Sequence, residues 1–185
     1  MASKSLEVAV FGGGCFWCTE AVFLRVGGVE TVTSGYAGGK MANPSYFQVS
    51  EEMTGHAEVV KLEFDPNIIS YDKLLDIFWH IHDPTTLNQQ GADVGTQYRS
   101  VILYTTEDQK HIAEATLAAL KASNEFRAPI VTEIKPLETF YTAEEYHQHY
   151  FDRNENQPYC QVVIDPKIKK LLAKYGDVVK PEIAS

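Results

Sequence analysis

The chain has 185 residues, of which 44% are hydrophobic and 22% are charged, and its formal net charge is −9. This length and composition are typical of one compact globular domain. The acidic charge argues against a nucleic-acid-binding protein. No apolar run is long enough for a membrane-spanning helix, and the N-terminal residues show no secretory signal. We therefore expect a cytoplasmic protein with no membrane partner.

Taken in chain order, the hydrophobic pattern predicts strands that alternate with helices. Strands are expected at residues 6–11, 29–36, 58–64, 100–104 and 131–137. Helices are expected at residues 15–26, 71–83, 106–122, 142–153 and 165–176. Residues 38–55 and 85–96 are expected to form long loops, which are often functional in a compact domain. The combination predicts an α/β (α+β) two-layer sandwich, in which helices pack on a mixed sheet.

The most informative motif is a glycine turn between the first strand and the first helix. Residues 12–14 are all glycine, which lets the strand end abruptly and places Cys15 at the start of the helix. A thiol there faces free N–H groups and the positive end of the helix dipole, which lower its pKa and favour the nucleophilic thiolate. Phe16 and Trp17 would form an apolar cup beside it. The alternative is a structural cysteine buried beside a tight turn.

The cysteines are three in number, and in a reducing compartment they are not expected to form a structural disulfide framework. Cys15 and Cys18 have the C-x-x-C spacing of a redox dithiol, which is also the spacing of half a zinc site. A zinc site needs two further ligands, and the candidates are His80, His82, His147 and His149. We favour the simpler interpretation that these histidines are polar residues on helix surfaces, and we predict no metal.

Glu58 falls on the apolar face of its predicted strand. It shares the parity of Val60, Leu62 and Phe64, so its carboxyl should point inward. Burial disfavours the ionised form and raises the pKa, and a neutral carboxyl can donate a proton. The alternative is that Glu58 lies at the strand end and turns back to solvent.

The two long loops carry further polar groups. The first contains Tyr46, the second contains Asp93, and Tyr98 follows just after the second. Hydroxyls and a carboxylate suit an active site, but ordinary surface turns have the same composition. Residue type alone does not separate these alternatives.

Together these residues resemble the MsrA family, the peptide methionine sulfoxide reductases, over about residues 8–164. The motifs that carry the resemblance are GGGCFWCTE (12–20), SGYAGG (34–39), NPSYFQV (43–49), TGHAEVVKLEFDP (54–66), HDPTTLNQQGADVGTQYRS (82–100) and YHQHY (146–150). The resemblance implies a single catalytic domain over residues 1–185. Its core would be the family's ferredoxin-like plait, followed by additional C-terminal helices that include residues 165–176.

The resemblance also implies a role for each site residue. Cys15 is the nucleophile, Phe16 and Trp17 receive the methyl group of the sulfoxide, Glu58 binds its oxygen with Tyr46 and Tyr98, Asp93 supports that network, and Cys160 matches the recycling cysteine. Many family members have glycine at the position of Cys18. Cys18 is therefore an alternative to Cys160 as the thiol that resolves oxidised Cys15.

The implied chemistry is thiol-dependent reduction of methionine S-sulfoxide, in proteins or as the free amino acid, in the repair of oxidative damage. The Cys15 thiolate attacks sulfur, Glu58 protonates the departing oxygen, and Cys15 is left as a sulfenic acid. A second cysteine then forms a disulfide with Cys15, which thioredoxin or another dithiol reduces. No metal, flavin or nucleotide cofactor is implied, and nothing requires more than a monomer.

Two other classes of protein remain as alternatives. A general thioredoxin-like disulfide oxidoreductase accounts for the C-F-W-C sequence, but not for the inward Glu58 or for the tyrosines of the two loops. A zinc-stabilised binding module would not be an enzyme, and it would carry stoichiometric zinc.

Overall fold

The computed structural model describes residues 3–184, and its centre is a mixed sheet of six strands in the order β7-β6-β1-β3-β2-β8. The strands are β1 (Glu7–Gly13), β2 (Val29–Ala37), β3 (Ala57–Phe64), β6 (Ser100–Tyr104), β7 (Glu133–Pro136) and β8 (Tyr141–Thr142). Neighbouring strands are antiparallel, except that β6 and β7 are parallel. A separate two-stranded hairpin is formed by β4 (Gln89–Gln90) and β5 (Asp93–Val94).

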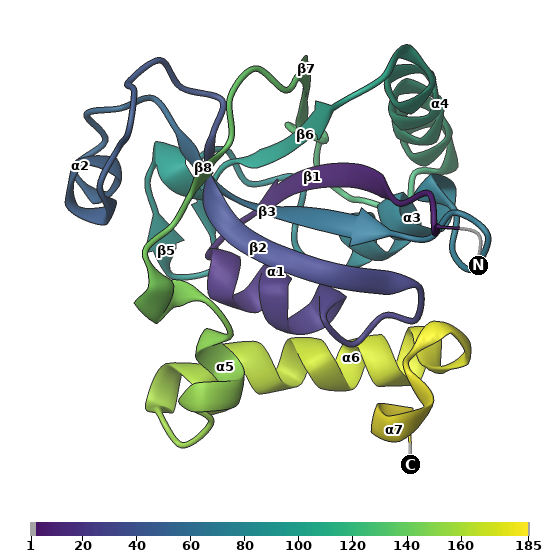
Figure 1. Cartoon of the computed structure of the whole chain (residues 1–185). Helices are drawn as coiled ribbons and strands as arrows, with labels where there is room; N and C mark the ends of the chain where they lie inside the picture. The colour runs from purple at the N-terminus through teal and green to yellow at the C-terminus, as the bar shows by residue number, and fades with distance from the viewer. Residues whose placement is uncertain (1–2, 185) are drawn as a thin grey trace.

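The helices connect and cover this sheet (Figure 1). They are α1 (Phe16–Phe23), α2 (Tyr46–Ser50), α3 (Tyr71–Ile81), α4 (Glu107–Ser123), α5 (Tyr150–Arg153), α6 (Asp165–Tyr175) and α7 (Pro181–Ala184). The four central strands lie in the order β6-β1-β3-β2, with α1 between β1 and β2 and α3 between β3 and β6. These elements therefore follow one another as β-α-β-β-α-β, which is consistent with the plait that the resemblance implied. Among residues 3–184, none of the helices is long and apolar enough to cross a bilayer.

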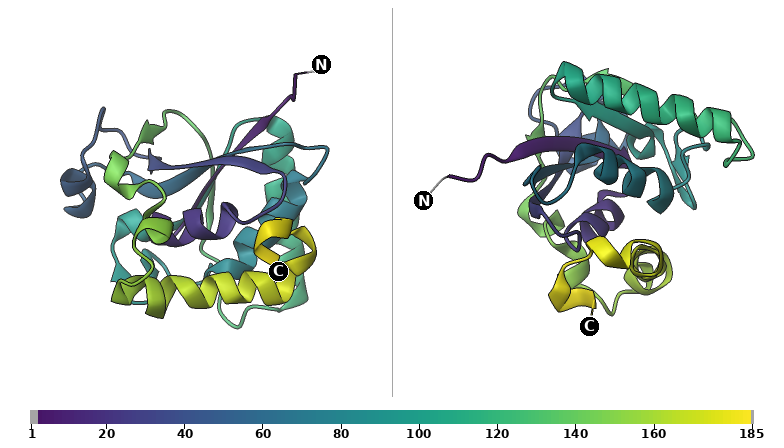
Figure 2. Two further views of the ribbon diagram at one scale, coloured as in Figure 1. Left: turned by 60° about the horizontal axis from the view of Figure 1, so that its bottom comes forward. Right: turned by 90° about the vertical axis from the view of Figure 1, so that its right-hand side faces the viewer.

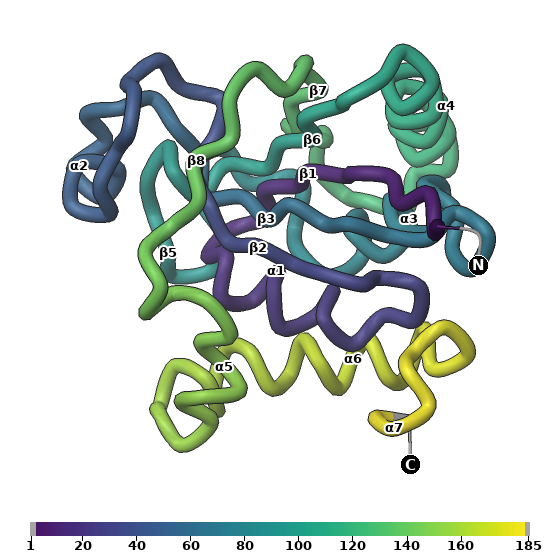
Figure 3. Tube along the Cα trace, viewed as in Figure 1, coloured from purple at the N-terminus to yellow at the C-terminus, as the bar shows by residue number. Residues whose placement is uncertain are grey.

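The chain after β8 forms an outer layer. Figure 2 shows α6 and α4 at opposite ends of the molecule, with the sheet between them. In the Cα trace of Figure 3, the chain runs from β8 along one side to α5, and α6 then returns beneath α1. The packing of α6 against both α1 and α3 fixes the segment that closes the region around Cys15.

Apolar side chains on both faces of the sheet form the core. On β1, Phe11 points into the larger cluster and Val10 into the smaller one on the opposite face. The ring of Phe11 stacks on Phe78 of α3 with centroids 5.0 Å apart. Burying a side chain of this size stabilises the fold by about 1.5–3 kcal/mol. The alternation along β1 and β3 therefore explains why the sheet is covered on both faces.

Most predicted elements are present, but the first predicted loop contains a helix. α2 begins at Ser45, whose hydroxyl accepts the Gln48 N–H at 3.3 Å while the Gln48 side chain accepts the Ser45 N–H at 3.0 Å. This capping box was readable from the sequence. The second predicted loop contains the β4–β5 hairpin, and a 3₁₀ turn, Thr96–Tyr98, begins at its last residue. The glycine run also does not stop the strand at once, because Gly12 and Gly13 still pair with β6.

The predicted helix over residues 142–153 is wrong. Thr142 does not cap a helix, because it pairs with Gly35 as part of β8. A 3₁₀ turn follows at Glu145–His147, and α5 begins only after His149, whose φ of 52° interrupts any continuous helix. The helix expected over residues 165–176 has no separate cap at Asp165. Asp165 is itself helical, since a π-helical turn at Cys160–Ile164 runs directly into α6.

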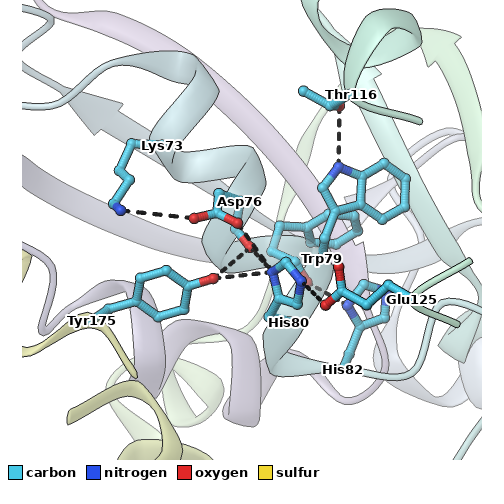
Figure 4. A network of polar contacts seen from close by, with 9 residues as sticks. Lys73, Asp76, Trp79, His80, His82, Thr116, Glu125 and Tyr175 are labelled. Carbon is cyan, nitrogen blue, oxygen red and sulfur yellow. Dashed lines mark hydrogen bonds and ion pairs between the residues drawn. The ribbon is translucent and has the colours of Figure 1, made fainter. Parts of the chain in front are cut away.

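A polar network around His80 holds α3, α6 and the end of α4 together (Figure 4). His80 Nε2 lies 2.7 Å from a carboxylate oxygen of Glu125, and Nδ1 lies 2.7 Å from the Asp76 carbonyl oxygen. Tyr175 of α6 donates to the same carbonyl at 3.1 Å. Trp79 donates to Thr116 of α4 at 3.2 Å. These bonds fix α6 at its C-terminal end.

Candidate active site

The turn before α1 sets the position of Cys15. Gly14 has a φ of +97°, which L side chains rarely adopt, and a Cβ there would lie 2.7 Å from Cγ of Gln90. Cys15 is the N-cap of α1, and its carbonyl accepts the Cys18 N–H at 3.1 Å. The Cys15 side chain is buried, with 8% of its surface exposed. The thiol is therefore held at the start of the helix, as the motif predicts.

A cavity of about 190 Å³ opens beside Cys15. It is lined by all of the residues predicted for the substrate side, and by one more: Cys15, Phe16, Trp17, Tyr46, Glu58, Asp93, Tyr98 and Tyr159. The fold thus brings together side chains from α1, α2, β3, β5 and the turn at residues 96–98. The sequence prediction did not include Tyr159.

Glu58 enters this cavity from β3 and has 2% of its surface exposed, as the alternation predicts. One of its carboxyl oxygens accepts the Phe16 N–H at 3.1 Å. Burial raises the pKa of Glu58 to about 8, and the hydrogen bond from Phe16 opposes that shift only in part. The carboxyl is therefore mostly protonated at neutral pH, and its second oxygen can carry the proton.

Two tyrosines face the cavity, one from the first predicted loop and one from just after the second. Tyr46 is the first residue of α2, and its N–H donates to the Glu144 carboxylate at 3.0 Å. Tyr98 ends the 3₁₀ turn. Burial raises the pKa of both phenols above the usual value, and the nearby Glu58 carboxyl adds to the shift. Both hydroxyls therefore stay protonated and can act as donors.

Asp93 is linked to Cys18 through Tyr159. The Tyr159 hydroxyl donates to an Asp93 carboxylate oxygen at 2.7 Å and lies 3.6 Å from the Cys18 sulfur. Tyr159 directly precedes Cys160, so the hydrogen bond to Asp93 ties that segment to the β4–β5 hairpin. Nothing in the sequence indicated this contact, since Tyr159 stood out there only as the residue before Cys160.

Trp17 is held by two residues of the segment 142–153, which the sequence predicted as one helix. Its ring stacks on Tyr150 with centroids 3.6 Å apart and an interplanar angle of 5°. Its indole N–H donates to Nδ1 of His147 at 3.0 Å. Burial lowers the pKa of His147, so its ring is neutral and carries the proton on Nε2. Trp17 therefore has a fixed orientation at the cavity.

The same segment is anchored to α1 by a buried carboxyl. Glu20 accepts hydrogen bonds from the Ser34 hydroxyl at 2.5 Å and from the His149 N–H. Burial raises the pKa of Glu20. The sequence prediction missed the burial of this residue and of His147. Glu20 is a single carboxyl in the first helix and His147 lies in a polar stretch, and neither position shows which distant residue will contact it.

The interpretation of the histidines as surface residues is wrong for two of them. His147 and His82 are buried, and His82 bonds the Phe78 carbonyl at 2.6 Å and the Ser100 hydroxyl at 2.7 Å. Burial lowers the pKa of His82 to about 3. Across residues 3–184, no group of three or more His, Cys, Asp or Glu side chains is placed to hold a metal ion. The geometry therefore gives no support to the zinc alternative.

The two thiols at the helix start behave as a pair. Burial raises the pKa of Cys15 well above its usual value, and the contacts with Cys18 and Glu58 add to this. The pKa of Cys18 is lowered to about 7, chiefly by the hydrogen bond with the Cys15 thiol. The predicted lowering of the Cys15 pKa is wrong for the resting protein, because burial outweighs the helix dipole. The pair still loses its first proton near neutral pH, and that ionisation belongs to both sulfurs.

Cys160 is placed differently from the other two cysteines. It lies in the π-helical turn, has none of its surface exposed, and lines neither of the two cavities that Cys15 lines. Cys18 lines the second of these cavities, of about 320 Å³, together with Cys15.

Comparison with known proteins agrees with this geometry. The family model for peptide methionine sulfoxide reductase matches residues 7–178. This chain belongs to the peptide methionine sulfoxide reductase family. The peptide methionine sulfoxide reductase MsrA of Sulfolobus acidocaldarius is 55% identical to it over 172 residues, which are 93% of this chain and 97% of that protein.

Solved structures of family members have the same fold. Mxr1 from Saccharomyces cerevisiae in its reduced form is 33% identical to this chain, with a TM-score of 0.76, covering 86% of this chain and 95% of that chain. Mxr1 in complex with Trx2 is 25% identical over the matched part, with a TM-score of 0.55, covering 78% of this chain and 84% of that chain. The cavity beside Cys15 lies within the matched family region.

Proposed function

We propose that this chain reduces methionine S-sulfoxide to methionine in the cavity beside Cys15, as a peptide methionine sulfoxide reductase. The observation that carries the proposal is the placement of a thiol and a protonated carboxyl in one cavity, since Cys15 and Glu58 both line it. Family membership supports the reaction type. The choice of the S epimer, and of protein-bound or free substrate, rests on the resemblance to the family.

In the proposed reaction, the Cys15 sulfur attacks the sulfoxide sulfur. The sulfoxide oxygen takes the proton from Glu58, while the hydroxyls of Tyr46 and Tyr98 stabilise its developing negative charge. The oxygen ends on Cys15, which becomes a sulfenic acid, and methionine departs as the thioether. The substrate sulfur gains two electrons and the Cys15 sulfur loses two, so the step balances.

The aromatic side of the cavity binds the substrate. Phe16 and Trp17 offer apolar surface to the methyl group of the sulfoxide, and the stacking on Tyr150 keeps Trp17 in place. Asp93 acts indirectly, by holding the Tyr159 hydroxyl at the edge of the cavity. A preorganised cavity of this kind needs little rearrangement when the substrate binds.

The second half of the proposed cycle returns Cys15 to the thiol. A second cysteine attacks the sulfenic acid, water leaves, and an external dithiol reduces the resulting disulfide. The complex of Mxr1 with Trx2 supports thioredoxin as this dithiol. The resemblance assigns the second cysteine to Cys160, with Cys18 as the alternative. Thiols supply the electrons and a carboxyl supplies the proton, so the cycle requires no prosthetic group, and its reduced thiols suit the cytoplasm.

The test is an assay with dabsyl-methionine sulfoxide, each epimer separately, with dithiothreitol as reductant. We expect turnover of the S epimer only, and none for the Cys15→Ser variant. Reduction of insulin disulfides without reduction of the sulfoxide would instead identify a thioredoxin-like oxidoreductase.

A further inference from the structure

Cys18 lies in direct contact with the nucleophile. The Cys18 N–H donates to the Cys15 carbonyl at 3.1 Å, and the two thiols shift each other's pKa, so their side chains lie against each other. Residues three apart at a helix start have Cβ atoms about 5–6 Å apart, and a disulfide needs about 3.5–4.5 Å. Cys15 is the N-cap and has non-helical backbone angles, so its side chain is not held in the helical arrangement relative to Cys18.

The cavity of about 320 Å³ gives this pair a second opening to solvent. It shares Cys15, Asp93 and Tyr159 with the substrate cavity, and it adds Cys18 and Lys167. Cys15 therefore lies between two cavities. Methionine sulfoxide fits the first, where Glu58 and the tyrosines gather, and the second reaches the Cys18 side of the thiol pair.

The surroundings of Cys18 favour a reactive thiolate. The Tyr159 hydroxyl lies 3.6 Å from its sulfur, and the hydrogen bond with Cys15 and the ammonium of Lys167 both lower the Cys18 pKa, which lies at about 7. Burial and the Asp93 carboxylate act in the opposite direction. Cys160, in contrast, is completely buried, and burial raises its pKa.

We propose that Cys18, not Cys160, attacks the sulfenic acid on Cys15, and that an external dithiol reaches the resulting disulfide through the second cavity. This inference rests on the proposed function. The Cys18 sulfur forms a bond to the Cys15 sulfur, the S–O bond of the sulfenic acid breaks, and the oxygen leaves as water with the thiol proton. The external dithiol then restores both thiols and becomes a disulfide itself. Cys160 is a packing residue in this scheme.

Tryptic peptides distinguish the two pairings directly. Cleavage after Lys4 and Arg25 places Cys15 and Cys18 in one peptide, residues 5–25, whereas Cys160 falls in the peptide 154–167. The reduced protein receives one equivalent of methionine S-sulfoxide without reductant. It is quenched with acid and N-ethylmaleimide at a series of short times and then digested. We expect peptide 5–25 to appear first as a single species, two hydrogens lighter and unalkylated, while Cys160 stays alkylated.

Two variants complete the experiment. Cys18→Ser should form any disulfide at least about tenfold more slowly, because a neighbouring thiol with a high effective concentration is lost. Its Cys15 should be trapped by dimedone as the sulfenic acid. Cys160→Ala, an apolar change in a buried turn, should form the disulfide at the rate of the unaltered protein. Thermal unfolding of each variant checks that it is folded.

The outcomes separate this inference from the proposed function. Release of one methionine per protein in the Cys18→Ser variant establishes the reductase step independently of the resolving step. If the first disulfide in the unaltered protein joins peptides 5–25 and 154–167, or if Cys160→Ala accumulates the sulfenic acid, the inference is overturned. If no variant releases methionine, the proposed function itself fails.

Discussion

The two sides of Cys15 differ in construction. On the substrate side the acid is placed by the central sheet: Glu58 comes from strand β3 and has 2% of its surface exposed. The Cys18 side is lined by the β4–β5 hairpin and by the turn that leads into α6, where Val162 has 73% of its surface exposed. The difference teaches that the step needing exact proton placement uses the rigid sheet, whereas the step needing a protein partner uses the accessible outer layer.

The largest expected effect is on the substrate side alone and comes from replacing Glu58. Glu58→Gln keeps the shape and the hydrogen bond from Phe16 but removes the acid. Single-turnover release of methionine at neutral pH should fall by about 10²–10⁴-fold, the usual range for a general acid. Disulfide formation from Cys15 oxidised by hydrogen peroxide should keep its rate. Unchanged methionine release would contradict the proton-donor role.

The pH dependence sharpens the assignment of that acid. Because burial raises the pKa of Glu58 to about 8, methionine release in the unaltered protein should decline as pH rises through about 8. The measurement is the single-turnover rate as a function of pH, with Glu58→Gln as the control that lacks this decline. A rate that keeps rising above pH 8 would point to a different proton source.

The same carboxyl should also make the free energy of unfolding depend on pH. The pKa of a solvent-exposed glutamate is 4.5, whereas that of the buried Glu58 is about 8, so the folded protein binds the extra proton. The stabilisation is fully present below the unfolded value and is lost as pH rises through the folded one. The free energy of unfolding, measured in urea, should therefore fall between these pH values. Glu58→Gln should show a flatter profile.

Replacing Tyr159 should have a smaller effect, on the rates of both methionine release and disulfide formation. Tyr159→Phe removes the hydroxyl that donates to Asp93 and that lies against Cys18. One such hydrogen bond is worth about 1 kcal/mol, or roughly fivefold in a rate. Methionine release and disulfide formation should both slow by this order. A change confined to methionine release would show that Tyr159 does not assist Cys18.

The smallest expected effect leaves the chemistry untouched. Tyr175→Phe removes the bond to the Asp76 carbonyl at the far end of α6. We expect a loss of about 1 kcal/mol in the free energy of unfolding and unchanged rates of both steps. Slower disulfide formation in this variant would mean that the Cys18 side depends on the whole of α6.

The sequence predicts the central strands well because continuous apolar runs mark the buried strands β1 and β6, while a period of two marks the second half of β3. Glu58 was found by that parity alone, and Cys15 by the glycine turn before α1. The segment from Thr142 to Arg153 was not predictable in the same way. Its first residues suggest the start of a helix, but Thr142 pairs with β2 as part of β8. The left-handed backbone of His149 then prevents one continuous helix over the remaining residues. Long-range pairing therefore overrode a local signal there.

The site residues that the sequence missed share a physical cause. Tyr159, His147 and Glu20 act through partners that are distant in sequence: Asp93, Trp17 and Ser34. Nothing in their neighbours along the chain marks these contacts. The pKa of Cys15 was likewise misjudged, because the dipole of α1 is visible in the sequence and the depth of burial is not.

The chain has two tryptophans, and their settings differ in a way that can be used. Trp79 has 1% of its surface exposed and bonds Thr116 in the core, away from the reaction. Trp17 lines the substrate cavity and stacks on Tyr150. Any change in tryptophan fluorescence when sulfoxide binds, or when Cys15 is oxidised, would therefore come from Trp17. The protein carries its own optical reporter, within one helical turn of the sulfur whose redox state it would follow.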